Sequence, residues 1–175
     1  MKKIFAICSL LTALCFGAAE AALPLLGFYK TIDDSTGNAK SIVRLYECDG
    51  SMCGRIVALF DPTGATIEET ISNPVRVAEI LEGKPHMDGL DIMWEMQWSE
   101  RNSEFSGGRI MDPKTGRVYR SRVWQDSDDE SLLRVRGMVG PFGRTQVWHA
   151  VRKSDLPKDL QKLDVSGWTP IIRER

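Results

Sequence analysis

The feature that most constrains this chain is a series of short segments in which apolar and polar residues alternate between turn-forming residues. Alternation with a period of two is typical of β-strands with one buried face, because successive side chains point to opposite sides of a sheet. Most connections are short, so we predict that neighbours in sequence pair as antiparallel strands. The predicted strands are residues 27–33, 41–48, 53–60, 90–98, 104–111, 117–125, 130–138 and 143–151.

Eight antiparallel strands can form an open sheet, a sandwich or a closed barrel. Closure removes the exposed edges and leaves room inside for one small ligand. The clearest strand, residues 90–98, carries an apolar series on one face, which consists of Leu90, Ile92, Trp94, Met96 and Trp98. The one long connection covers residues 61–89, and we predict one or two helical turns within it at residues 75–82.

The two ends of the chain stand outside this pattern. A basic start at residues 1–3 precedes a largely apolar run, and small residues flank Glu20 as a signal peptidase requires. The run is shorter than the ~20 residues that span a bilayer, so we predict a signal peptide, with a membrane anchor or a lipoprotein as alternatives. The predicted parts are a signal peptide at 1–21, cleaved after Ala21, a barrel domain at 22–152, and a partly helical or extended C-terminal extension at 153–175.

Export determines what we expect of the cysteines and of the compartment. The mature chain keeps Cys48 and Cys53, and nearby thiols pair in the oxidising periplasm or outside the cell. A zinc site needs four ligands, and neither His86 nor His149 has ligand-like spacing to these cysteines. We therefore predict a periplasmic or secreted protein that does not span the membrane after processing. It has a Cys48–Cys53 disulfide and no metal or cofactor.

Composition and motifs exclude several classes of function. The chain has 23 basic and 24 acidic residues, so no overall positive field favours nucleic acid. It lacks a Gly-x-Ser-x-Gly nucleophile elbow, a P-loop and a His-Glu-x-x-His zinc helix. We predict a protein that is not an enzyme, and a small hydrolase or isomerase is the alternative.

Seven strings of the sequence are familiar in their order, namely residues 27–33, 40–43, 53–57, 107–113, 116–119, 133–137 and 143–148. Together they resemble the bacterial exported domain-of-unknown-function family 2147 (DUF2147) over about residues 26–152. The resemblance implies an all-β, eight-stranded antiparallel up-and-down lipocalin-like (calycin-type) barrel that binds a small ligand or a partner. The chain departs from the family pattern at Tyr29, where members commonly have Trp. It also lacks the cysteine pair that many members carry in the long connection.

Side-chain parity identifies the candidate site. Charged residues belong outside a barrel, so Tyr119 and Gly137 are predicted to point inward, opposite the faces of their neighbouring arginines. Arg144, Gln146 and Trp148 share one face, which lies either outside or inside. We predict a non-catalytic barrel for a small apolar or amphipathic molecule, and an envelope-interaction barrel with a filled interior is the alternative. The predicted ligand-binding residues are Trp94, Trp98, Tyr119, Gly137, Arg144 and Trp148.

Two predictions concern arginines. The lipocalin-like resemblance implies that Arg144 packs over Tyr29 and closes one end of the barrel, whereas direct contact with the carboxylate of an amphipathic acid is the alternative. On the outer surface, pairing of inward residues would place Arg122 opposite Arg134 and Arg120 opposite Arg136. Like charges in such positions repel, so we predict either a basic patch for anionic envelope components or a surface neutralised by carboxylates. The patch consists of Arg120, Arg122, Arg134 and Arg136.

Overall fold

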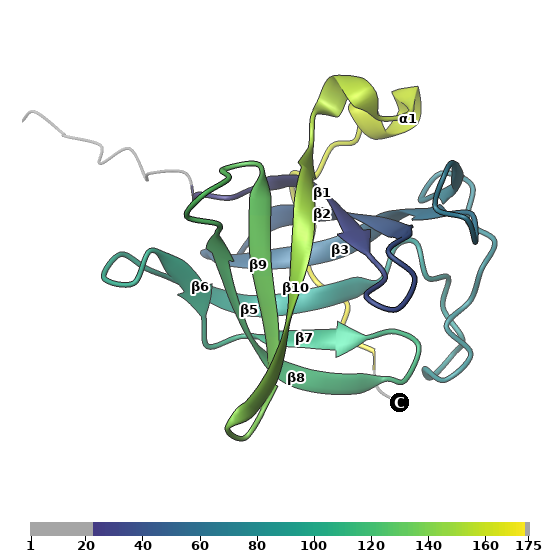
Figure 1. Ribbon diagram of the computed structural model, residues 1–175. Helices are drawn as coiled ribbons and strands as arrows, with labels where there is room; N and C mark the ends of the chain where they lie inside the picture. The colour runs from purple at the N-terminus through teal and green to yellow at the C-terminus, as the bar shows by residue number, and fades with distance from the viewer. Residues whose placement is uncertain (1–22, 174–175) are drawn as a thin grey trace, which may run out of the picture.

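The computed structural model describes residues 23–173, which contain ten β-strands and two short helices (Figure 1). The predicted signal peptide and its predicted cleavage site after Ala21 lie outside the described residues. No helix among residues 23–173 is long and apolar enough to cross a membrane. The strands are β1 (Gly27–Ile32), β2 (Ala39–Cys48), β3 (Ser51–Phe60), β4 (Ile67–Thr70), β5 (Asp91–Ser99), β6 (Glu104–Ser106), β7 (Arg109–Asp112), β8 (Arg117–Gln125), β9 (Leu132–Val139) and β10 (Phe142–Val151).

The strands form one antiparallel sheet that closes on itself. Its order is β4-β3-β2-β1-β10-β9-β8-β6-β5-β7, and a further pairing of β3 with β5 completes the ring. Both β6 and β7 pair with β5 and with β8, so they are two parts of one barrel strand. The short β4 pairs with β3 at the edge of the ring. The predicted eight-stranded antiparallel barrel is therefore confirmed.

A break separates β6 from β7, where the sequence predicts one continuous strand. Gly107 has a φ of +82°, a left-handed conformation that favours glycine. At Gly108 a Cβ atom would collide with the Trp94 carbonyl oxygen and lie 2.7 Å from the backbone carbonyl carbon of Glu95, so only glycine fits against β5. Glu95 on β5 has a φ of +58° beside this contact. The two strands thus approach closely through irregular backbone rather than through a regular ladder.

The long connection contains no helix, so the predicted helical turns at residues 75–82 are wrong. It contributes β4 and two isolated bridges, one of which joins Val77 to His86. The buried carboxylate of Glu69 accepts the backbone N–H groups of Val75 at 3.0 Å and of Arg76 at 2.7 Å. This local bonding gives these N–H groups a partner outside any helix.

The two ends of the barrel differ in how they are filled. The β2–β3, β5–β6 and β8–β9 connections meet at one end, which we call the filled end. Large apolar side chains occupy the barrel near this end, each at most 1% exposed, and they include Leu45, Met52, Met96, Phe105, Val123 and Leu133. The β1–β2, β7–β8 and β9–β10 connections meet at the opposite end, which we call the open end.

The C-terminal extension forms a second core on the outside of the barrel. It contains the 3-10 helix η1 (Lys153–Asp155) and the helix α1 (Lys158–Gln161), so the short helix expected after the last strand is present. Leu156 and Leu160 from this segment pack against outward side chains of β1, β2 and β3. These side chains are Phe28, Ile42, Val57 and Ala58. Beyond α1, the segment runs along the outside of the barrel (Figure 1).

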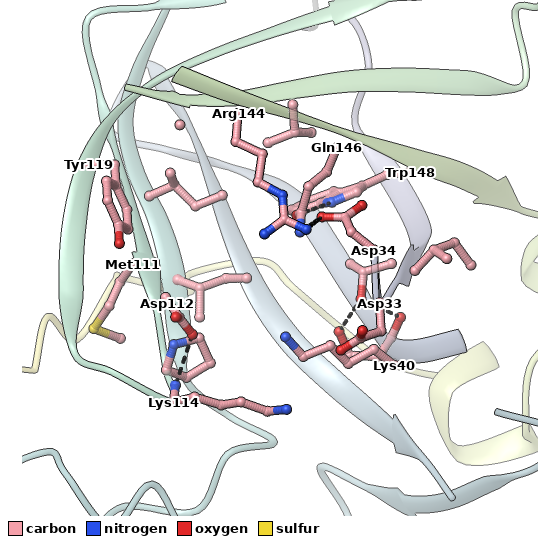
Figure 2. A pocket seen from close by; sticks show the side chains of 18 of the residues that line it. Asp33, Asp34, Lys40, Met111, Asp112, Lys114, Tyr119, Arg144, Gln146 and Trp148 are labelled. Atoms are coloured by element: carbon pink, nitrogen blue, oxygen red, sulfur yellow. Dashed lines mark hydrogen bonds and ion pairs between the residues drawn. The ribbon is translucent and has the colours of Figure 1, made fainter. Parts of the chain in front are cut away.

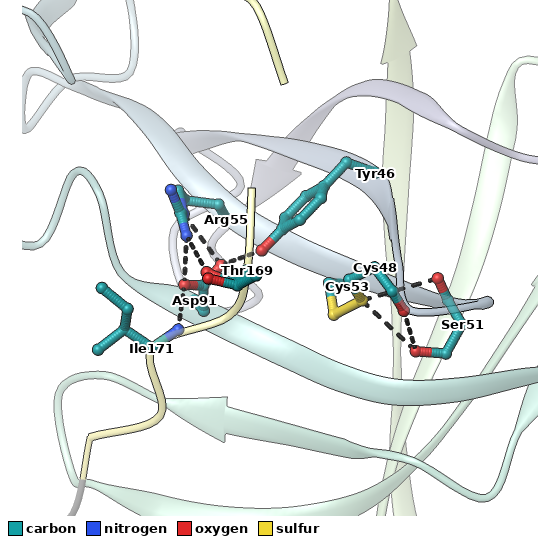
Figure 3. The surroundings of a disulfide bond; sticks show 8 residues. All are labelled: Tyr46, Cys48, Ser51, Cys53, Arg55, Asp91, Thr169 and Ile171. Carbon is teal, nitrogen blue, oxygen red and sulfur yellow. Dashed lines mark hydrogen bonds and ion pairs between the residues drawn. A yellow bond between two sulfur atoms is a disulfide. The ribbon is translucent and has the colours of Figure 1, made fainter. Parts of the chain in front are cut away.

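The last described residues bind the outer face of β2, β3 and β5, and we call this region the clasp (Figure 3). The buried Asp91 carboxylate accepts the Tyr46 hydroxyl at 2.7 Å, Nε and Nη2 of Arg55 at 3.0 and 2.7 Å, and the Ile171 N–H at 2.9 Å. Burial, and then the bond to Asp91, raises the pKa of Tyr46. The Trp168 ring packs edge-on against Tyr46 and under the Arg55 guanidinium.

The predicted Cys48–Cys53 disulfide is present beside the clasp (Figure 3). The two Cα atoms lie 5.9 Å apart, within the range that a disulfide requires. Both cysteines are buried, and the Ser51 hydroxyl donates to the Cys48 carbonyl at 2.8 Å within the turn that they flank. The disulfide thus joins β2 and β3 where the hairpin turns.

Candidate functional site

A cavity of about 610 Å³ occupies the barrel towards the open end. This volume lies within the range of about 300–1,000 Å³ that is typical of small-molecule sites. Its deeper wall is apolar and consists of Ile56, Ile92, Ile110, Val135 and Trp148. The interior is therefore filled by side chains at one end of the barrel, as the alternative prediction expected, and contains a cavity at the other end.

The structure brings four of the predicted ligand-binding residues together. Tyr119, Gly137, Arg144 and Trp148 all line the cavity. They come from β8, β9 and β10, whose regular pairing preserves the parity that the sequence showed. A Cβ atom at Gly137 would lie 3.5 Å from Tyr119 Cβ, which is ordinary van der Waals contact, so the glycine leaves usable space in the wall.

Trp94 and Trp98 do not line the cavity. Strand β5 shifts its register against β3 near Ile92 and again between Met93 and Met96. These irregularities turn Trp94 to the outer face, opposite Arg109, whereas Trp98 keeps the predicted inward face, opposite Phe105. Trp98 packs against Phe105 of the filled end, with ring centroids 5.0 Å apart. Of the apolar series on this strand, Ile92 is the member that reaches the cavity.

The shared face of Arg144, Gln146 and Trp148 points into the cavity, which resolves the two alternatives for β10 (Figure 2). The Trp148 indole donates to Gln146 Oε1 at 3.3 Å, and Gln146 Nε2 donates to Asp34 Oδ2 at 3.1 Å. The same Asp34 oxygen forms an ion pair with Arg144. These four side chains form one continuous network along the wall and rim.

The predicted packing of Arg144 over Tyr29 is wrong. Tyr29 pairs with Ala150, which lies six residues from Arg144 along β10. At ~3.3 Å per residue, the two side chains belong to opposite ends of the barrel. Tyr29 instead donates its hydroxyl to the Leu25 carbonyl at 3.1 Å. Arg144 is 70% exposed at the rim.

Besides Asp34, four charged rim residues were missed by the sequence reasoning. Asp33, Lys40, Asp112 and Lys114 line the mouth of the cavity. They lie at or between the ends of predicted strands, where charged residues are common and carry no motif. A usable signal existed, because alternate connections of an up-and-down barrel gather at the same end. The β1–β2 and β7–β8 connections are related in this way, and they bring these four residues to one opening.

The cavity offers hydrogen bonds and charges without an evident reaction centre. Neither His86 nor His149 is among its lining residues. No group of three or more His, Cys, Asp or Glu side chains within residues 23–173 is arranged to hold a metal ion. The Tyr119 hydroxyl lines the wall and has no hydrogen-bond partner in that part of the chain, so it is available to a ligand.

The outer arginines follow a register that differs from the predicted one. Arg122 lies opposite Arg136, and Arg120 lies opposite Met138, a shift of two residues. Hydrogen bonds to Asp126 and Asp129 stabilise a longer turn, so β9 begins at Leu132 rather than at residue 130. A shift of two residues keeps every side chain on its predicted face.

Carboxylates neutralise part of this outer surface. Arg122 pairs with Glu104 at 2.5 Å, and Arg134 pairs with Asp126 at 2.5 Å. Arg120 and Arg136 form no ion pair with any carboxylate of the described residues. Arg109 on β7, which has none there either, lies directly opposite Arg120. The unneutralised arginines are therefore Arg109, Arg120 and Arg136, which we call the outer basic surface.

Comparisons with known proteins agree with this architecture. A solved structure titled "Protein HP1028 from the human pathogen Helicobacter pylori belongs to the lipocalin family" is similar to 80% of this chain and 90% of that chain. The TM-score is 0.59 and the sequence identity is 18%, so the similarity concerns the fold. The comparison with curated proteins finds no match. The family model described as "Uncharacterized protein conserved in bacteria (DUF2147)" matches residues 27–150, and the chain therefore belongs to this bacterial family with a lipocalin-like barrel.

Proposed function

We propose that the protein binds a small apolar or amphipathic molecule in its barrel and does so without catalysis. The observation that carries this proposal is the cavity of about 610 Å³, which combines an apolar wall with a few polar groups at its mouth. Such a combination is typical of sites in which apolar burial gives affinity and polar groups fix the orientation. The lipocalin-like fold supports the same function by analogy of architecture.

The test fills the cavity without adding charge. In the Gly137→Leu variant, the new side chain would extend from a position that already touches Tyr119 and Ile110. Binding of dodecanol, followed through the fluorescence of the cavity residue Trp148, should fall at least tenfold, while circular dichroism stays unchanged. Val147→Leu enlarges a neighbouring β10 side chain on the opposite face and should bind normally. If Gly137→Leu binds dodecanol like the wild type, or the wild type binds no amphiphile, the proposal is wrong.

We also propose that the protein acts in the periplasm or after secretion. The support is the predicted signal peptide together with the disulfide, because disulfides persist in oxidising compartments. Fractionation of the natural host and N-terminal sequencing of the mature chain test this proposal. A mature chain that begins at Ala22 in the exported fraction is expected, and an intact chain in the cytoplasm would contradict it.

A second proposal concerns the outer basic surface and phosphate-bearing components of the envelope. Arg109 and Arg120 lie opposite each other on adjacent strands without a neutralising carboxylate in the described chain, and an anion between them would relieve their repulsion. Binding to vesicles that contain phosphatidylglycerol should weaken with salt and in the Arg109→Ala/Arg120→Ala variant. Arg134→Ala, which removes an arginine already paired with Asp126, is the matched control. Salt-insensitive binding, or none, would refute this proposal.

A further inference from the structure

Three cationic side chains lie at the mouth of the cavity, and they differ in whether a carboxylate already pairs with them. Arg144 already forms an ion pair with Asp34. Asp34 in turn accepts a hydrogen bond from Gln146. A ligand that recruited Arg144 would leave Asp34 without its cation, and breaking such a network has a cost. The other two cations are Lys40 and Lys114. Neither ammonium group has an ion-pair or hydrogen-bond partner within residues 23–173, although both residues line the cavity.

The remaining carboxylates of the mouth are engaged by their own turns. Asp33 Oδ1 accepts the Ser35 hydroxyl and the N–H groups of Ser35 at 3.0 Å and of Thr36 at 3.3 Å. The bonds from Ser35, first from its hydroxyl and then from its N–H, lower the pKa of Asp33 to about 2. Asp112 accepts the backbone N–H of Lys114 at 3.0 Å and the Thr115 hydroxyl at 2.9 Å.

Because of these bonds, the aspartates and the lysines of the mouth differ in how available they are to a ligand. Asp33 Oδ1 and both oxygens of Asp112 already accept hydrogen bonds within their turns, and Asp34 is paired with Arg144. All three donors of each lysine ammonium group are unused by the described chain. A cationic head group would meet carboxylates that are mostly engaged, whereas an anionic one would meet two ammonium groups that are free within residues 23–173. The mouth therefore favours an anion, even though its three cationic residues and its three aspartates balance in number.

The two lysines converge from different parts of the barrel. Lys40 lies near the start of β2, and Lys114 lies in the turn between β7 and β8. In Figure 2 their side chains extend from opposite walls with the ammonium ends turned towards one another across the opening. Lysine stems are flexible, so the two charges can adjust to a head group held between them. Deeper in the barrel, the wall becomes apolar at Ile92 and Val135.

We propose that Lys40 and Lys114 form an anion clamp and that the ligand is an amphipathic molecule with an anionic head, a carboxylate or a phosphate. The head lies between the lysines at the mouth, and the apolar tail extends inward along Ile56 and Trp148. This assignment rests on the proposed binding function of the cavity and names the chemical class of its ligand. It places the anion on residues other than Arg144, which the sequence had indicated.

The experiment compares four probes that share one tail, namely dodecanoate, dodecyl phosphate, dodecanol and dodecylamine. The Lys40→Met/Lys114→Met variant keeps the apolar stems and removes both charges. It should lose about 10-fold to 100-fold affinity for the two anions, as expected for charge-assisted hydrogen bonds, and none for dodecanol. Lys153→Met/Lys158→Met removes the same charge from the C-terminal extension and is the matched control. The ratio of losses for dodecanoate and dodecyl phosphate distinguishes a carboxylate ligand from a phosphate ligand.

The outcomes separate the clamp from the cavity function. Equal losses for dodecanol and dodecanoate, or an unchanged affinity for both anions, would refute the clamp while leaving the cavity as a binding site. Tighter binding of dodecylamine than of dodecanoate would assign the head group to Asp33 or Asp112 instead and would equally refute it. If no probe binds the wild type, the cavity function itself is wrong, and the clamp fails with it.

Discussion

The clasp and the mouth of the cavity differ in how many of their polar groups have a hydrogen-bond partner. In the clasp, one buried carboxylate, that of Asp91, receives four hydrogen bonds from Tyr46, Arg55 and Ile171. At the mouth, the ammonium groups of Lys40 and Lys114 donate none to the described chain. Satisfied buried networks rigidify a fold, whereas unused donors beside a cavity are available to another molecule. The comparison predicts that the clasp contributes strongly to stability and that the proposed ligand binding depends on the mouth.

The variant with the largest expected effect removes Asp91, the carboxylate at the centre of the clasp, and tests whether stability and binding depend on different regions. Asp91→Ala leaves the Arg55 guanidinium without its carboxylate and frees the Ile171 N–H. Breaking a buried ion pair costs about 3–5 kcal/mol, so the free energy of unfolding in urea should fall by about that amount. Dodecanol affinity, measured where the variant remains folded, should change little, because Asp91 does not line the cavity.

A matched control for this variant is Asp164→Ala. Asp164 is exposed and accepts a backbone N–H from Ser166 at 2.9 Å, so its loss should alter stability by well under 1 kcal/mol. If Asp91→Ala were equally mild, the clasp would not be a principal source of stability. If it instead abolished dodecanol binding in folded protein, the separation between clasp and mouth would be wrong.

The second prediction tests the same separation of stability from binding by removing the disulfide. Replacing both Cys48 and Cys53 with Ala should reduce the free energy of unfolding by about 2 kcal/mol, the chain-entropy value for so short a loop. Both cysteines belong to the clasp side of the barrel and neither lines the cavity, so ligand affinity should be retained. Urea unfolding with and without reductant measures the effect. The reduced wild type should have the same free energy of unfolding as the double variant. A wild type whose free energy of unfolding does not change with reductant would contradict the stabilising role of the disulfide.

The sequence predicted most of the regular barrel because alternation and turn residues are local signals. Strand β8 begins and ends where the pattern placed it, at Arg117 and Gln125. Tyr119 and Gly137 line the cavity as predicted, since a register shift of two residues preserves the face of each side chain. These parts of the site needed no knowledge of contacts distant in sequence.

The failed predictions depend on contacts that local patterns do not contain. Trp94 leaves its predicted face at the irregularities of β5, beside the close contact with Gly108 of the next barrel strand, whereas Trp98 points inward at the filled end rather than at the cavity. The clasp joins Arg55 to Thr169 across more than a hundred residues, through a bond of 3.0 Å. The clamp needs the β1–β2 and β7–β8 connections to meet. Each depends on segments that come together only when the chain has folded, and the clamp itself is a proposal.

The smallest predicted effect concerns Asp88, a buried aspartate near Glu69 whose side chain has no hydrogen-bond partner in the described chain. It is 3% exposed, and neither carboxylate oxygen has a partner within residues 23–173. Burial, and then the nearby charge of Glu69, raises the pKa of the Asp88 carboxyl. The folded state therefore holds this proton more tightly than the unfolded chain does. Its contribution to stability is complete below the unfolded pKa of about 4 and declines as pH rises through the folded pKa.

Asp88→Asn removes this dependence, because the amide carries no charge at any pH. At pH 7 the variant should unfold with a free energy about 1 kcal/mol higher than that of the wild type, the order expected for relief of an unsatisfied buried group. The gain should shrink towards zero at pH 3, where Asp88 is protonated in both states. Asp49→Asn makes the same chemical change in an exposed turn and should show no such gain. An equal gain at both pH values would mean that packing, rather than the buried charge, distinguishes Asp88 from the fully bonded Asp91.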